Sequence, residues 1–363
     1  MISSFEQFDV FIGGEDNVHT YRIPALLATA GGALLAFCEA RKISQGDASP
    51  TDMVLKRSLD GGRSWRPPQV LVAGEGNEAI MNPCPVIDGQ TIFLICMNAH
   101  KKARCRHQHL LLRSEDDGQS WSQPVVLDAC IAPYDDTFVP GPGVSIRMRD
   151  GRLVVPGYTN VITDDGSRPA SFSRVLYSDD QGRTWRMGQP VASSTSNESQ
   201  VVELADGSLL INWREQNHLD ASAHRGRRGT AVSRDGGETW SEPVFARELN
   251  EAPCQAGFLR YSLAGTGDRN RLLFSNPDAV PGPEGGARTK MTVRMSYDEG
   301  QTWPVARLIH GGPSIYSSLA VLPDGLITLL YECGEEERYE RIRLARFSLE
   351  WLTRGKDSLA IKA

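Results

Sequence analysis

Three arginines stand at the ends of strand-like runs in widely separated parts of the chain. Arg22 precedes the run ALLAT, Arg214 ends the run SLLINW, and Arg288 opens the run TKMTVRM. A guanidinium group is planar, stays charged, and bonds both oxygens of a carboxylate at once. If the three converge, they would hold one carboxylate. If they do not, each is an ordinary surface arginine, and their spacing alone leaves both interpretations open.

Convergence requires an architecture that brings distant segments together, and an internal repeat indicates one. The phrase Ser-x-Asp-x-Gly-x-(Ser/Thr)-Trp occurs five times, and successive copies begin 56, 64, 55 and 63 residues apart. A period of this size is typical of a repeat protein. The copies are Ser58–Trp65, Ser114–Trp121, Ser178–Trp185, Ser233–Trp240 and Ser296–Trp303.

Each copy of the phrase has the chemistry of a tight turn. Its Asp and Gly supply local hydrogen bonding and a backbone that tolerates positive φ. The Ser and Asp oxygens can accept bonds from backbone N–H groups that the turn leaves free. The Trp is a large apolar anchor for a neighbouring sheet. Because a strand-like run precedes each copy, we expect one β-hairpin per repeat.

The repeat predicts an all-β fold, a six-bladed β-propeller with four-stranded antiparallel blades. The five copies account for five blades. The sixth would use Ser317–Leu322, Gly325–Glu332 and Ile342–Phe347, with the N-terminal run Phe8–Ile12 as the strand that closes the last blade. We expect a single domain over residues 1–363. A β-solenoid or a sandwich is the alternative architecture.

Composition narrows the functional class. The net charge of −6 argues against a nucleic-acid partner, and no apolar run is long enough to span a membrane. The N-terminus has no basic region followed by an apolar stretch, so no secretory signal is expected. The seven cysteines are scattered without a CxxC pair, which favours free thiols in a reducing, cytoplasmic compartment and no zinc site. We expect no metal and no cofactor.

One basic cluster interrupts the acidic chain within the second repeat. A solvated hairpin loop is one interpretation of it, and a docking patch for an anionic surface is the other. Its members are His100, Lys101, Lys102, Arg104, Arg106, His107 and His109.

Several phrases outside the repeat identify a resemblance. Tyr-Arg-Ile-Pro at residues 21–24, Glu-Ala-Arg at 39–41 and the five turns, which correspond to Asp boxes, resemble the exo-α-sialidase family of six-bladed propellers. The likeness covers almost the whole chain. Further segments that resemble mammalian cytosolic sialidases are Met81–Pro85, Val139–Gly143, Leu153–Pro156, Glu198–Val201 and Leu330–Glu332.

The resemblance implies a role for each matching residue. Arg22, Arg214 and Arg288 fall where the family grips the sialic acid carboxylate. Tyr316 falls at the tyrosine nucleophile, and Glu198 at the glutamate that activates it. A phenol suits this substrate because its anomeric carbon carries a carboxylate, which would repel a carboxylate nucleophile.

Other matches complete the site that the resemblance implies. Asp47 falls at the acid/base aspartate, and Glu332 where a carboxylate steadies the first arginine. The sugar pocket would be lined by Glu39, Arg41, Asn82 and Tyr158.

Two of these positions have a competing neighbour. Asp52 would replace Asp47 if the loop register is shifted, and Glu203 lies on the same strand-like run as Glu198.

The resemblance therefore implies a hydrolase that removes terminal α-linked sialic acids from glycans with retention of configuration. Its partners would be sialylated glycans. Three alternatives stay open: the same mechanism on another nonulosonic acid such as Kdn, a trans-sialidase, and a non-catalytic propeller that binds sialoglycans or a protein.

Overall fold

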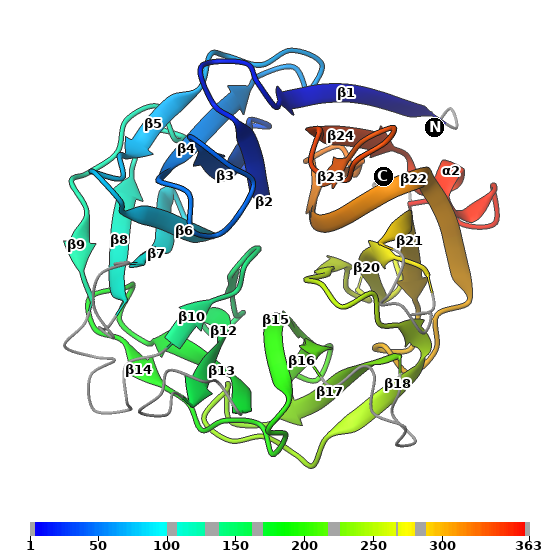
Figure 1. Cartoon of the computed structure of the whole chain (residues 1–363). Helices are drawn as coiled ribbons and strands as arrows, with labels where there is room; N and C mark the ends of the chain where they lie inside the picture. Colours follow the sequence, from blue (N-terminus) through cyan, green and yellow to red (C-terminus); the bar gives the residue numbers. More distant parts are fainter. Residues whose placement is uncertain are drawn as a thin grey trace.

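The structure, a computed structural model, describes residues 4–99, 107–127, 138–161, 170–216, 226–265, 268–279 and 288–359, and these residues are mostly β-strand. The sheets stand around a common centre, so that the chain runs once around a ring (Figure 1). The prediction of an all-β fold is confirmed. Within the described ranges, no helix has the length and apolar character needed to cross a membrane.

Hydrogen bonding groups the described strands into four sheets. The first has eight strands, and a single parallel pair, Thr51 with Ala79, joins its two halves. Its strands are β2 (Thr20–Ala28), β3 (Leu34–Arg41), β4 (Thr51–Ser58), β5 (Gln69–Val72), β6 (Ala79–Asp88), β7 (Thr91–Ala99), β8 (Gln108–Ser114) and β9 (Val125–Val126).

The second and third sheets follow in chain order. The five-stranded sheet contains β10 (Phe138–Pro140), β11 (Ile146–Arg147), β12 (Leu153–Val161), β13 (Ala170–Ser178) and β14 (Arg186–Met187). The four-stranded sheet contains β15 (Ser196–Glu203), β16 (Leu209–Glu215), β17 (Arg227–Ser233) and β18 (Val244–Asn250).

The fourth sheet has seven strands and unites the two ends of the chain. Its strands are β19 (Gly257–Ser262), β20 (Arg271–Pro277), β21 (Thr289–Ser296), β22 (Val305–Val321), β23 (Ile327–Cys333), β24 (Arg341–Phe347) and β1 (Phe5–Ile12). The N-terminal strand β1 pairs antiparallel with β24, as predicted, and Figure 1 shows the two side by side. This pairing closes the ring between its first and last strands.

The predicted hairpins are confirmed at all five copies of the repeated phrase. The strands β4, β8, β13, β17 and β21 each end at the Ser of a copy, and each pairs antiparallel with the strand that follows the turn. In the second copy, Ser114 Oγ accepts a bond from Gly118 N–H at 2.9 Å, and Asp116 Oδ1 accepts one from Ser120 N–H at 2.8 Å. The side-chain oxygens therefore satisfy the turn's free N–H groups.

The turns also fasten neighbouring strand groups together. Trp121 of the second Asp box packs edge-on against Phe37 of β3, with ring centroids 5.8 Å apart. Gly62 of the first has φ +92°, and a Cβ there would stand 2.1 Å from Leu344 of β24. Glycine is needed at this position both for the backbone conformation and for the close approach.

Near the C-terminus, the predicted start of one strand was wrong and one short helix was missed. The strand expected from Ser317 is the second half of β22, which begins at Val305 and pairs with β21 along its first half and β23 along its second. A short helix, α2 (Leu349–Thr353), follows β24 and was not anticipated. Its N-cap is Ser348, whose side chain accepts a bond from Trp351 N–H.

The Asp boxes should contribute to stability in a pH-dependent way. Hydrogen bonds from the Ser120 side chain and backbone lower the pKa of Asp116 from 3.8 to about 2. A carboxyl group with a lowered folded-state pKa stabilises the fold above its unfolded pKa, and this contribution is lost as the pH falls towards 2.

We therefore expect Asp116→Asn to lower the free energy of unfolding at pH 7 by about 1 kcal/mol, with a smaller difference at pH 3. Urea unfolding at the two pH values measures this. Glu115→Gln is the matched control, since it removes the same charge from the adjacent exposed position. An equal effect of both substitutions would contradict the explanation by turn bonding.

Candidate active site

The first predicted arginine is held by a buried carboxylate from the other end of the chain. Arg22 Nε, on β2, donates to Glu332 Oε1 on β23 at 2.8 Å, and the two side chains are 7% and 0% exposed. Burial alone would lower the pKa of Arg22, but the Glu332 carboxylate outweighs it and raises the pKa. The guanidinium therefore stays charged although it is buried.

The backbone beside Arg22 is irregular, which places the arginine differently from the prediction. Arg22 was expected just before a strand, but it lies within β2, where a register shift separates it from Ala25. Ile23 has φ +58°, a left-handed conformation that is rare for a β-branched residue. Its N–H donates to Glu332 Oε1 at 2.7 Å, so the same carboxylate holds the strained backbone.

The predicted nucleophile and base are in direct contact. The Tyr316 hydroxyl, on β22, donates a hydrogen bond to Glu198 Oε1 on β15, and both residues are 7% exposed. Glu198 Oε2 in turn accepts a bond from Arg214 Nη1 at 3.0 Å. Burial, reinforced by the Glu198 carboxylate, raises the pKa of the Tyr316 phenol well above 10. The phenol is therefore protonated at neutral pH and has a base beside it.

The second and third arginines come from neighbouring sheets. Arg214 lies near the end of β16, and its pKa is raised because the attraction of Glu198 exceeds the effect of burial. Arg288 directly precedes β21, as predicted, and its guanidinium donates to the carbonyl of Pro253. The carbonyl of Arg288 accepts a bond from Ser314 N–H at 2.8 Å, two residues before Tyr316 in the chain.

A second ion-pair cluster is centred on Arg41. Arg41, fully buried at the end of β3, donates to Glu39 Oε2 through Nε at 3.0 Å and Nη2 at 2.7 Å. Its Nη1 pairs with Asp47 Oδ1 at 2.9 Å, and the Asp47 side chain is 82% exposed. Glu39 Oε1 accepts a bond from Asn82 N–H at 2.9 Å. Arg41 thus links a buried carboxylate to one that solvent or a ligand can reach.

These two clusters face one cavity of about 390 Å³. Seven of the predicted residues line it: Arg22, Arg41, Asp47, Asn82, Tyr158, Glu198 and Tyr316. Glu39 and Glu332 are fully buried and hold the lining arginines. Arg214 and Arg288 are not among the lining residues. Arg214 reaches the cavity wall through Glu198, and the bonds of Arg288 run to the backbone of Pro253 and Ser314.

The two competing carboxylates have partners elsewhere. Asp52 Oδ1 pairs with Lys42 at 2.7 Å and accepts a bond from Gly74 N–H at 2.8 Å. Glu203 pairs with Arg149 at 2.9 Å on the surface. Neither lines the cavity. The geometry therefore favours Asp47 and Glu198 over their neighbours.

Sequence reasoning missed several residues of the site. Tyr339 lies under the Arg22 guanidinium, 4.0 Å from it to the ring centroid, but it stands in a polar stretch with no recognisable motif. Met81, Met97 and Val139 give one side of the cavity an apolar lining.

The interpretation of the basic cluster as a solvated loop was wrong for His109. His109 is buried on β8, with Nε2 2.6 Å from the carbonyl oxygen of Phe138, and His107 lines the cavity. The other five members lie outside the described residues. His109 opens a run of four buried residues on β8, and its hydrogen bond to Phe138 satisfies one ring nitrogen there.

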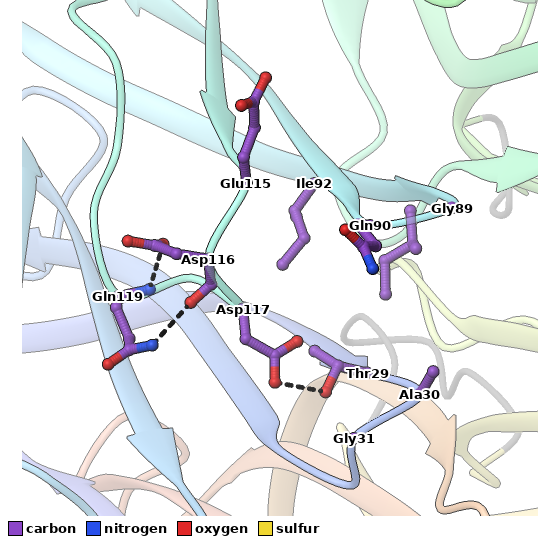
Figure 2. Close-up of a pocket in the computed structure, with 11 residues that line it drawn as sticks. Thr29, Ala30, Gly31, Gly89, Gln90, Ile92, Glu115, Asp116, Asp117 and Gln119 are labelled. Atoms are coloured by element: carbon purple, nitrogen blue, oxygen red, sulfur yellow. Dashed lines mark hydrogen bonds between the residues drawn. The ribbon is translucent and has the colours of Figure 1, made fainter.

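Two other cavities in the described part of the chain are lined by none of the predicted site residues. The one in Figure 2, about 390 Å³, lies at the second Asp box, where Thr29 Oγ1 donates to Asp117 Oδ2 at 3.2 Å. A larger one of about 770 Å³ lies at the fifth Asp box beside Trp303. Among the residues that the structure describes, no group of three or more His, Cys, Asp or Glu side chains is placed to hold a metal ion.

The chain is similar to known sialidases in sequence and in fold. Residues 20–329 match the model of the BNR repeat-like domain. The chain is 33% identical to a sialidase of Micromonospora viridifaciens, over 96% of this chain and 54% of that protein, and 29% identical to Sialidase-3 of Mus musculus, over 91% of each. A solved Hadza microbial sialidase is 28% identical with a TM-score of 0.80, covering 95% of this chain and 69% of that one.

The buried pair of Arg22 and Glu332 should dominate the stability of the site. We expect Glu332→Ala to lower the free energy of unfolding by about 3 kcal/mol or more, because it leaves a buried guanidinium and two backbone N–H groups without their acceptor. Glu203→Ala removes a surface pair and should cost under about 1 kcal/mol. Urea denaturation of both variants measures the difference, and similar losses would contradict this account.

Proposed function

This chain belongs to the sialidase family of BNR-repeat proteins, and from that premise we propose that it is an exo-α-sialidase. It would hydrolyse terminal α-linked sialic acids on glycans. The single observation that carries the proposal is the contact between Tyr316 and Glu198, which is flanked by Arg22 and Arg214 at the wall of one cavity.

The paired phenol and carboxylate suit a retaining mechanism. Tyr316 Oη would attack the anomeric carbon while its proton passes to Glu198 Oε1, the present acceptor of its hydrogen bond. A phenol with a raised pKa is a poor nucleophile by itself, so the adjacent base is required. The bond to the leaving oxygen breaks as the new bond to Tyr316 forms. Water then displaces the tyrosine from the same carbon, and two inversions give net retention.

Asp47, which lines the same cavity, is the proposed acid and base. It would donate a proton to the leaving glycosidic oxygen and later accept one from the attacking water. Its 82% exposure leaves it accessible to a leaving group at the cavity mouth, and its bond to Arg41 keeps it there. Glu39 and Arg41, with Asn82 and Tyr158, would contact the sugar or support the residues that do.

The arginines supply the recognition of the substrate's carboxylate. Arg22, Arg214 and Arg288 would bind it together, and their fixed charges would offset charge changes in an oxocarbenium-like transition state. Arg214 Nε is buried and has no hydrogen-bond partner, so one donor of its fork is unused.

Family membership also supports six blades in one domain. If the eight-stranded sheet is divided at its single parallel pair and the seven-stranded sheet within β22, the four sheets become six antiparallel groups. The last group would contain the second half of β22 with β23, β24 and β1. We propose that residues 1–363 form one propeller of this kind.

Substitution of Tyr316 tests the proposed nucleophile. Tyr316→Phe should lower kcat for 4-methylumbelliferyl α-N-acetylneuraminide by at least about 10³-fold and still bind a sialic acid glycal inhibitor, since the arginines are intact. Initial rates and inhibitor titration measure the two properties. Tyr331→Phe, on the adjacent strand β23, is the matched control. Wild-type rates in Tyr316→Phe would overturn the mechanism.

Substitution of Asp47 tests the acid with two leaving groups. Asp47→Ala should lower the rate on sialyllactose by about 10²–10⁴-fold and the rate on the aryl glycoside by less, because an aryl oxide departs with little protonation. Asp52→Ala should change neither the rate on sialyllactose nor the rate on the aryl glycoside. Equal losses on both substrates would argue against general-acid catalysis by Asp47.

The alternative outcomes are separable in the same assays. Faster turnover of the Kdn glycoside would assign another nonulosonic acid, and sialylated product in excess lactose would assign transfer. Binding of the glycal without turnover of any glycoside would assign a non-catalytic propeller.

A further inference from the structure

One further buried ion pair does not line the candidate active site and has no part in the proposed chemistry. Arg228, on β17, and Glu251, directly after β18, are 1% and 0% exposed. Their closest atoms, Arg228 Nη1 and Glu251 Oε2, are 3.3 Å apart. Arg228 Nε also donates to Asn212 Oδ1 on β16 at 2.8 Å. Burial of such a pair costs free energy unless hydrogen bonds satisfy the remaining donors and acceptors of both groups.

The remaining bonds of this pair run to the backbone beside two of the three proposed carboxylate-binding arginines. Glu251 Oε2 accepts a bond at 3.0 Å from the N–H of Glu215, the residue after Arg214. Arg228 Nη1 donates at 2.8 Å to the carbonyl of Cys254, the residue after Pro253.

Pro253 is the residue whose carbonyl anchors the Arg288 guanidinium. Arg214 and Arg288 belong to different sheets, so their separation is not set by strand pairing between them. The Arg228–Glu251 pair connects Arg214 and Arg288 through a short chain of hydrogen bonds. At one end it bonds Glu215, the residue after Arg214, and at the other end it bonds Cys254, the residue after the Pro253 anchor of Arg288.

Electrostatics agree with this arrangement. Burial raises the pKa of Glu251, while Arg228 and the Glu215 N–H group act in the opposite direction, and Arg214 is close enough to add to them. The Glu251 carboxylate therefore compensates positive charge on Arg228 and on Arg214. Cys254 packs in one cluster with Ile315 and Tyr316, so a shift of this segment would also reach the proposed nucleophile.

We propose that Arg228 and Glu251 are positioning residues that set the separation of Arg214 and Arg288 for a single carboxylate. The inference rests on the proposed function, since it concerns how the substrate's carboxylate is gripped. The pair touches no substrate and moves no proton. Its effect is on the geometry of the groups that do.

Conservative variants of the pair test the proposal. Glu251→Gln and Arg228→Lys should each raise the KM for the aryl sialoside and the inhibition constant of the sialic acid glycal by about tenfold, with kcat changed much less. Lysine keeps the charge of Arg228 but cannot bond Asn212 and Cys254 at the same time. Weaker binding in Arg228→Lys would therefore be due to lost geometry and not to lost charge.

The control is another buried ion pair, which does not line the cavity. Asp357 bonds Arg271 through both oxygens, at 2.7 and 2.8 Å, and neither residue lines the candidate site. Asp357→Asn should lower the melting temperature as much as Glu251→Gln does, yet leave KM and the inhibition constant unchanged. If the Glu251 and Arg228 variants lose stability and keep wild-type KM, the pair is merely structural and the proposal is wrong.

A double-mutant cycle adds a readout that a general loss of stability cannot imitate. If Arg228 acts through the anchor of Arg288, then Arg228→Lys should weaken glycal binding in the wild type but hardly further in Arg288→Lys. Fully additive losses would overturn the proposal.

Two further outcomes are decided in the same series. If Glu251→Gln does not fold, Asn212→Ser is the substitute variant, because it keeps the ion pair and removes only the acceptor of Arg228 Nε. It should raise KM about threefold. An unchanged KM in Asn212→Ser would contradict the proposal. A wild type that neither binds the glycal nor hydrolyses sialosides refutes the proposed function and this inference together, whereas a wild type that binds as well as its variants refutes the inference alone.

Discussion

The carboxylate of Glu332 is the interaction on which the candidate site depends. It accepts bonds from Arg22 Nε and the N–H groups of Ile23 and Tyr316, and it joins residues 310 positions apart in the chain. It therefore exists only after the ring has closed. In a fragment without Glu332, Arg22 would stay in water, because burial of a guanidinium group is favourable only beside a partner. Closure of the fold and assembly of the site are the same event.

The five Asp boxes and the cavity illustrate two different uses of polar groups. In the boxes, hydroxyl and carboxylate oxygens satisfy the N–H groups of their own turn, within four residues, and the result is the same in every copy. At the cavity, the contacts that hold Arg22 and Tyr316 come from other strands, and Arg41 is bonded by a carboxylate of its own strand, Glu39. Local bonding makes the repeated frame robust, whereas long-range bonding makes the site specific to one place in the ring.

This difference explains how much the sequence could predict. The strand ends at the serines and the pairing of the N-terminal strand with the last sheet follow from local turn chemistry and from the need to avoid an open edge. The site residues Tyr316, Glu198 and Asp47 were located by resemblance, since their spacing carries no period. What escaped prediction lacks a local signal: the bulge that places Arg22 inside β2, the length of β22, and Tyr339 stacked on Arg22. These depend on tertiary contacts between distant segments.

The anchors of the three arginines differ, and the differences have a physical logic. Arg22 has its own fully buried carboxylate, Arg214 shares Glu198 with Tyr316, and Arg288 is bonded to a backbone carbonyl. If each had a dedicated carboxylate, the cavity would be neutral towards an anion. Because Glu198 also accepts the Tyr316 proton in the proposed reaction, the positive charge of Arg214 is least compensated when that glutamate is protonated. The grip on the substrate's carboxylate would then be strongest at the moment the new bond forms, which is when stabilisation accelerates the reaction.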